Sequence, residues 1–214
     1  SPSRGRGDVY KRQLFFGRTE NFWEMAETGP CGPDSELHFD LGPEHCNMQD
    51  TPGHVCRVNG DCSRLLELWN LVFIQSNRKD DGSLDSLPSK HVDTGAALER
   101  IATILQGKTS NYDTDLFQPI IQKIESLMDS SYQEDPTPHR VIADHIRMLC
   151  FSIADGALPS NEGRGYVLRR ILRRAARFGR ILGMHEPFLY KIATRVSDAM
   201  GETFPEVMEK RTHI

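Results

Sequence analysis

The 214-residue sequence has few cysteines, no long apolar run and little net charge. Its five cysteines are too few and too unevenly placed for the disulfide framework of a small secreted domain. No apolar stretch has the length of a signal peptide or a membrane span, so we expect a cytoplasmic protein that does not contact membranes. The net charge of −4 argues against a uniformly basic nucleic-acid-binding surface. A local basic patch and any oligomeric state stay open.

Residues before Ser110 have the pattern of an antiparallel sheet. Short extended runs at 36–40, 65–75 and 90–93 alternate with turns rich in glycine and proline. The run at 65–75 is nearly all apolar, as in a central strand covered on both faces. Asn70 within it then needs a polar partner.

Residues after Ser110 have apolar side chains at helical spacing, and we expect breaks between helices at 129–139 and 156–165. Residues 1–13 combine glycine, arginine and serine without an apolar period, so we expect them outside the fold, as a non-native or disordered segment. The 38% hydrophobic content allows one core or two small ones. The sequence therefore predicts an α+β fold.

Several long blocks of the sequence resemble the alanyl-tRNA synthetase family, a family of class II aminoacyl-tRNA synthetases. The blocks are NFWEMAETGPCGPDSELHFD at 21–40, LWNLVFIQSNR at 68–78, HVDTGAALERIATILQGKTSNYDTDLF at 91–117, RVIADHIR at 140–147 and NEGRGYVLRRILRRAARFG at 161–179. The match extends from about Glu20 to the last residue. Several blocks in the same order are far more specific than one short pattern.

The resemblance implies part of a class II antiparallel sheet, followed by an all-helical tRNA-recognition region. Residues 14–109 would form the later part of the aminoacylation domain, and residues 110–214 a truncated domain that reads the tRNA acceptor stem. The implied activity is ATP-dependent activation of L-alanine, with Mg²⁺ at the phosphates, and transfer to tRNA(Ala). The first two class II motifs and the editing region are expected outside these residues. We therefore expect the isolated chain not to activate alanine, and robust pyrophosphate exchange by it would contradict this.

Two candidate catalytic residues lie where an extended segment runs into a helix. The resemblance implies that Asp93 binds the ammonium group of alanine, although an aspartate before Thr-Gly is also common as a turn or cap residue. Gly95 shares its strand face and is a further candidate substrate contact. The resemblance also implies that the Arg100 guanidinium lies over the adenine ring of ATP. The alternative for Arg100 is an ion pair with a glutamate on the helix surface.

Three more residues match positions that line the alanine pocket in the family, namely Trp23, Asn70 and Val72. Without the resemblance, Trp23 is equally well explained as a core residue. The sequence departs from the family at Ala97, where glycine is usual, and at Asp34, where cysteine is usual. The methyl group of Ala97 puts close approach of the backbone to a ligand in doubt, whereas Asp34 is interpreted as a tolerated variant.

The segment 164–182 separates apolar and basic side chains at helical spacing. The apolar stripe is Leu168, Ile171, Ala175, Phe178 and Leu182, and the arginines proposed to bind tRNA are Arg164, Arg169, Arg170, Arg173, Arg174 and Arg177, followed by Arg180. Clustered arginines repel one another unless a polyanion such as an RNA backbone neutralises them. A solvated basic face without a partner is the alternative.

Asn161 precedes this arginine-rich segment and is the candidate residue for recognising the nucleotide sequence of a bound RNA. The resemblance implies that it contacts the G·U pair of the alanine acceptor stem through the minor groove. The alternative is that Ser160 or Asn161 only caps the helix that follows.

The segment CNMQDTPGHVCRVNGDC is not part of the family signature. Cys46, His54, Cys56 and Cys62, within residues 44–62, offer three thiolates and an imidazole, which suit a structural tetrahedral Zn²⁺ ion. Four protein ligands leave no open position for catalysis. The alternative is an insertion with free thiols.

Two other functions stay open. One is an RNA-binding module that keeps the arginine-rich helix after losing catalysis. The other is a zinc-organised interaction protein, for which chelation causes unfolding and alanine and ATP have no effect. Fusing the missing upstream motifs to the chain would restore adenylate formation only in an enzyme fragment.

Overall fold

The computed structural model describes residues 12–128 and 130–214, and the chain divides into two compact units between Ile101 and Ala102. The expected boundary between 109 and 110 lies within the second unit. The expectation for residues 1–13 falls almost entirely on residues 1–11, which lie outside the described part of the chain.

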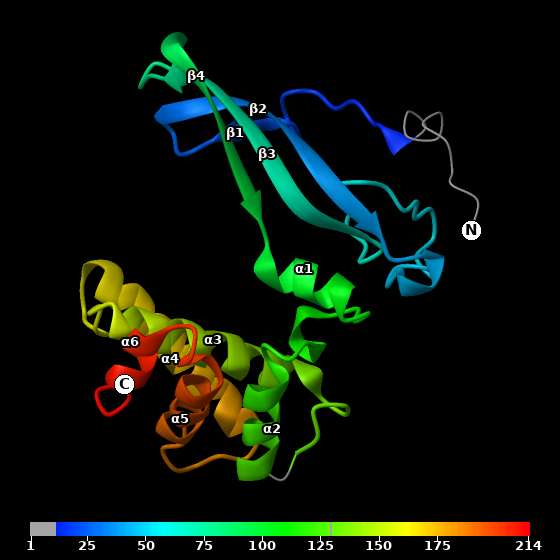
Figure 1. Ribbon diagram of the computed structural model, residues 1–214. Helices are drawn as coiled ribbons and strands as arrows, with labels where there is room; N and C mark the ends of the chain where they lie inside the picture. The colour runs from blue at the N-terminus through cyan, green and yellow to red at the C-terminus, as the bar shows by residue number, and fades with distance from the viewer. Residues whose placement is uncertain (1–11, 129) are drawn as a thin grey trace. The chain divides into compact units, whose positions relative to one another are not determined.

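The first unit is built on a four-stranded antiparallel sheet in which β3 lies between β2 and β4 (Figure 1). The strands are β1 (Phe22–Glu24), β2 (Gly29–Asp40), β3 (Leu65–Arg78) and β4 (Leu84–Ala96), in the order β1-β2-β3-β4. The three runs expected to be extended all lie within strands, but the strands are longer. Backbone hydrogen bonds to the adjacent strand keep residues of low strand propensity extended, so the strands continue past the apolar runs.

At Gly32, in the first half of β2, the strand passes very close to the backbone of β3. A Cβ atom at this position would overlap the backbone carbonyl of Phe73, so only glycine allows β2 to approach β3 this closely. The register of the two strands also shifts between Cys31 and Asp34.

The expectation that β3 is covered on both faces is wrong for the described residues. Val72 is buried, with 6% of its surface exposed, whereas Trp69 and Phe73 on the opposite face are 41% and 42% exposed. The apolar run therefore reflects one partly covered face, on which Val72 is the buried residue, and one half-exposed aromatic face.

The second unit is helical, and its core lies between α2, α3 and α5. The helices are α1 (Leu98–Leu105), whose first turn lies in the first unit, α2 (Gln118–Leu127), α3 (Pro136–Ala154), α4 (Gly163–Ile181), α5 (Leu189–Met200) and α6 (Pro205–Glu209). The largest fully buried core residues include Ile120, Ile121, Ile124, Ile142, Ile192 and Val196. Among the described residues, no helix combines the length and apolar character that crossing a membrane requires.

The expected break at 129–139 ends earlier than the sequence suggested, because α3 begins at Pro136. His139 lies in the first turn of α3 and is fully buried. Its Nδ1 atom lies 2.8 Å from the Asp135 carbonyl oxygen, and its Nε2 atom lies 3.2 Å from the Ser130 hydroxyl. The histidine is thus a satisfied core residue that joins the linker to the helix.

Candidate functional site

One face of the sheet gathers most of the predicted substrate-binding residues. Asn70 pairs with Gly95 and Val72 pairs with Asp93 across β3 and β4. Val72 also pairs with Asp34 of β2, so the side chains of these residues alternate onto the same face. We call Asp34, Asn70, Val72, Asp93 and Gly95 the polar face. A single face therefore holds two carboxylates and an amide around a buried valine.

Asp34 supplies the polar partner that Asn70 needs. The Asn70 amide Nδ2 donates to Asp34 Oδ2 at 2.9 Å. The other oxygens of the two side chains, Asp34 Oδ1 and Asn70 Oδ1, are buried and accept no hydrogen bond from the described residues. The sequence alone predicts a tolerated variant at Asp34, and the strand register reveals its contact with Asn70. Two buried acceptors on one face suit a ligand that carries several donors.

Burial raises the pKa of Asp34 above its ordinary value of 3.8, and the Asn70 hydrogen bond only partly opposes this. Because the folded state then holds the proton more tightly than the unfolded state, the free energy of unfolding should fall as pH rises from about 3.8 through the folded-state pKa. We expect Asp34→Asn to lose this decline. Urea unfolding of both proteins across this pH range measures it, with the exposed Asp80→Asn as control. An unchanged pH profile in Asp34→Asn would refute the assignment.

Arg100 lies in α1, directly after β4, and its side chain reaches back to β3. Its guanidinium Nη1 donates to the Glu67 carbonyl oxygen at 2.8 Å and to Glu67 Oε2 at 3.1 Å. Glu67 thus holds the orientation of Arg100. Ala97, at the departure from the family pattern, donates its backbone N–H to the Leu68 carbonyl oxygen at 3.2 Å. Trp23 lies in β1, opposite Gly32 and on the far side of β2 from the other predicted pocket residues.

Helix α4 exposes its arginines and buries its apolar stripe against the helical unit. Leu168 and Ala175 are buried, whereas the predicted tRNA-binding arginines are all exposed. None of the seven arginines from Arg164 to Arg180 forms an ion pair with a carboxylate of the described residues. A shallow hollow on this face is lined by Tyr166, Arg169, Arg170 and Arg173. The surface is therefore an uncompensated cationic patch that suits an anionic ligand.

The capping alternative for Asn161 is wrong. Helix α4 begins at Gly163 after Glu162, and no side chain in the described part of the chain caps it. The Asn161 carbonyl Oδ1 instead accepts a hydrogen bond from Arg169 Nη1. Ser160 organises the loop through its backbone N–H, which donates to the Gly165 carbonyl oxygen at 2.9 Å. The Asn161 amide is thus oriented by an arginine one to two turns into the helix.

The loop between β2 and β3 brings the four predicted metal ligands together. The nearest ligand atoms of Cys46, His54, Cys56 and Cys62 all lie within 4.8 Å of one another. Cys46 Sγ lies 3.2 Å from His54 Nε2, and Cys56 Sγ lies 3.5 Å from the same atom. We call these four residues the Cys/His cluster, which is a group that could hold a metal ion.

Comparison with known proteins identifies the family. The sequence model of the family "tRNA synthetases class II (A)" matches residues 7–214. The chain belongs to this family. As a class II synthetase chain of the alanine group, it has the mixed α+β architecture that the sequence predicted.

Two alanine–tRNA ligases illustrate how similar this class II chain is to its relatives. The ligase of Chlorobium chlorochromatii is 52% identical over 203 residues, which cover 92% of this chain and 22% of that protein. The ligase of Anaeromyxobacter dehalogenans is 52% identical over 215 residues, which cover 99% of this chain and 24% of that protein. The synthetase chain thus spans about a quarter of the length of the curated relatives that it matches.

Proposed function

We propose that this chain is the part of an alanine–tRNA ligase that binds alanine and the acceptor stem of tRNA(Ala). The observation that carries the proposal is the polar face, which brings two carboxylates, an amide and a valine together on adjacent strands of a class II synthetase sheet. Its alanine-specific relatives support the choice of amino acid.

The polar face suits two groups of alanine, the ammonium that all amino acids share and the methyl side chain that distinguishes it. The ammonium group has three donors, and Asp93, Asp34 Oδ1 and Asn70 Oδ1 supply acceptors on the same face. Val72 offers an apolar surface of the right chemistry for a methyl side chain. We assign Asp93 to the ammonium, Val72 and Gly95 to contact with the substrate, and Trp23 to the edge of the pocket.

ATP would be held beside this face by Arg100. A guanidinium is a good partner for a nucleotide base because it stacks on π faces while keeping its charge. Glu67 holds the Arg100 guanidinium through Nη1, and the Arg100 side chain is 38% exposed, so the residue fits a stacking role. Mg²⁺ would accompany the nucleotide phosphates, and we assign no residue of this chain to it. The chain's contribution to activation is positioning and charge stabilisation.

Helix α4 would bind the phosphates of the acceptor stem through Arg164, Arg169, Arg170, Arg173, Arg174 and Arg177. Its uncompensated charge supports this assignment, because phosphate contacts position a duplex without reading its sequence. Asn161 would read the stem. Since Arg169 takes its carbonyl oxygen, the amide Nδ2 is left to donate to a base edge.

A chimera tests the proposed function. The 203-residue segment of the Chlorobium chlorochromatii ligase is replaced by the corresponding residues of this chain, giving a protein that we call the chimera. We expect alanine-dependent exchange of pyrophosphate into ATP within about tenfold of the parent enzyme, because volume-conserving core differences are tolerated. A folded chimera that binds tRNA stems without exchange would instead support an RNA-binding module.

Replacement of Asn161 tests the reading of the stem. We expect Asn161→Ala in the chimera to lose about 5- to 150-fold of its preference for a G·U stem over a G·C stem, the value of about 1–3 kcal/mol per base contact. Binding to two RNA minihelices that differ only in that pair measures the preference. Ser160→Ala, in the same loop, is the control. An equal loss of affinity for both stems would show that Asn161 only supports the loop.

A further inference from the structure

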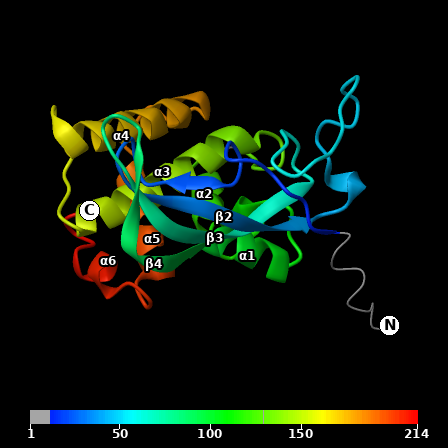
Figure 2. The same ribbon diagram turned by 90° about the horizontal axis from the view of Figure 1, so that it is seen from above.

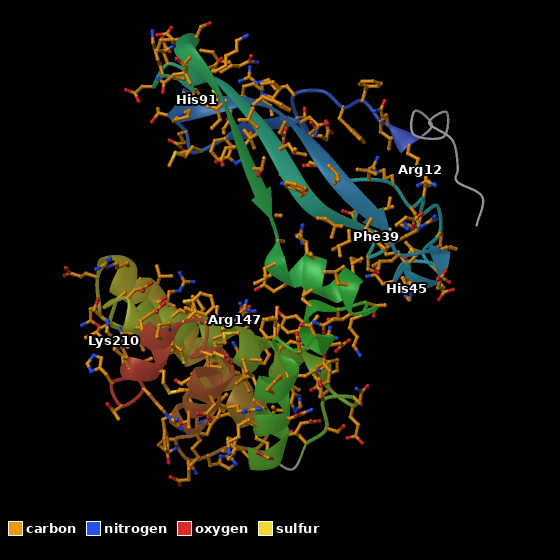
Figure 3. All side chains as sticks on the ribbon, viewed as in Figure 1. Arg12, Phe39, His45, His91, Arg147 and Lys210 are labelled. Carbon is orange, nitrogen blue, oxygen red and sulfur yellow. The ribbon has the colours of Figure 1, made fainter. Side chains whose placement is uncertain are left out.

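The loop 41–64 joins β2 to β3 and extends beyond their paired ends (Figure 2). In Figure 3, His45 marks this loop and Phe39 marks the adjoining end of β2. All of its residues belong to the described part of the chain, and Cys46 and Cys62 are the only buried ones among them. Val55, an apolar residue of the loop, is 74% exposed. The loop therefore has no apolar core, and its interior is the Cys/His cluster itself.

Hydrogen bonds hold the base of the loop in place. Arg64 forms a two-point contact with the Asp40 carboxylate, with both N···O distances 2.7 Å. Asn47 and Ser63, which follow Cys46 and Cys62, bond to each other in both directions: Asn47 N donates to Ser63 Oγ at 3.2 Å, and Ser63 N donates to Asn47 Oδ1 at 2.9 Å. Two thiol groups are therefore placed side by side by contacts that do not involve sulfur.

His54 and Cys56 come from the far part of the loop, and their side chains return to this pair. A tetrahedral Zn²⁺ ion, with bonds of about 2.3 Å to sulfur and about 2.0 Å to nitrogen, spaces its ligand atoms about 3.4–3.8 Å apart. The distances of 3.2 and 3.5 Å to His54 Nε2 are close to this spacing. Since no two of the ligand atoms are more than 4.8 Å apart, the cluster needs to contract by no more than about 1 Å.

We propose that Cys46, His54, Cys56 and Cys62 bind one Zn²⁺ ion that organises the β2–β3 loop. Thiolate sulfur and imidazole nitrogen select zinc over Mg²⁺ or Ca²⁺, which prefer oxygen. Binding releases the thiol protons to solvent and leaves three Zn–S bonds and one Zn–N bond. The ion is structural, because four protein ligands fill its coordination shell. The Met48 backbone N–H, 3.4 Å from Cys46 Sγ, supports that sulfur as a thiolate.

The ion would also fix the edge of the polar face. Asn59 lies between the last two ligands, and its Nδ2 atom donates to Glu36 Oε2 at 3.2 Å. Glu36 pairs with Asn70 in the sheet. Folding of the loop around zinc therefore places Asn59 against the strand that carries Asp34.

Metal analysis of the full chain, purified without a polyhistidine tag, tests the proposal. We expect about one zinc per chain and, after exchange for Co²⁺, the visible absorption of tetrahedral thiolate coordination. Cys62→Ser and His54→Gln should each lose most of the bound metal. The matched controls Cys150→Ala, in α3, and His45→Gln, in the loop but outside the cluster, should keep it.

A second measurement uses the unsubstituted chain, so that a misfolded variant does not decide the result. Chelation should speed hydrogen exchange in loop 41–64 and leave the exchange of helices α2 to α5 unchanged, and added Zn²⁺ should reverse the effect. The proposal is overturned if the chain retains no zinc and shows no cobalt spectrum. It is also overturned if the control variants lose metal as the ligand variants do, or if two of the three thiols are found joined in a disulfide.

Discussion

Asp93→Asn in the chimera should reduce kcat/KM for alanine by about 30- to 1,000-fold, because the ammonium of the substrate loses its charged partner on the polar face. The KM for ATP should change little, since Asp93 on β4 is assigned to the alanine ammonium and Arg100, held by Glu67, to the nucleotide base. Pyrophosphate exchange at varied alanine and varied ATP separates the two effects.

Asp85→Asn is the matched control for this substitution. Asp85 lies in the same strand and pairs with Lys79 at 2.6 Å, at the far end of the sheet from the polar face. The control should keep kcat/KM for alanine within about threefold of the chimera. If Asp93→Asn behaves as this control does, the ammonium site lies elsewhere and the assignment of the polar face fails.

Replacement of three arginines of α4 by glutamine should weaken binding of an acceptor-stem minihelix by about 100-fold or more at low salt. The triple variant Arg169→Gln, Arg173→Gln and Arg177→Gln removes one stripe of the cationic face. The slope of log association constant against log salt concentration should become shallower by about 2–3 units. Each arginine–phosphate contact releases about one counterion when the RNA binds, and the variant lacks three such contacts. Filter binding at several salt concentrations measures both quantities.

The control for the triple variant is Lys191→Gln, in α5, the next helix along the chain. Lys191 is exposed, and the substitution removes a positive charge from the same helical unit but not from α4. We expect it to leave the salt slope within about 0.5 units. A triple variant with an unchanged slope would mean that the basic face is solvated and has no RNA partner.

The strands could be placed from sequence, but their contacts could not. Alternating apolar residues located parts of β2, β3 and β4, and the position of Asn70 in an apolar run predicted that it needs a partner. The identity of that partner depends on the register between β2 and β3, which shifts between Cys31 and Asp34. No local pattern records such a shift, so the Asp34 contact was missed.

For the helical unit, too, the sequence predicted which residues are exposed but not which contacts they make. The stripe of arginines on α4 was predicted correctly as exposed, because 3.6-residue periodicity alone determines it. The start of α4 was predicted to within one residue, but the suggested cap was wrong, because Glu162 before Gly163 has no side-chain cap among the described residues and the Asn161 side chain contacts Arg169 instead. Sequence identified the four residues of the Cys/His cluster from their chemistry, whereas their proximity depends on the contacts that close the loop base.

The most direct test of the account is the structure of the chimera bound to a non-hydrolysable alanyl-adenylate analogue. We predict that an Asp93 carboxylate oxygen lies about 2.7–3.1 Å from the ammonium nitrogen, with the methyl group of the analogue against Val72 and its adenine stacked on Arg100. An analogue whose ammonium and methyl groups contact residues outside the polar face would contradict it.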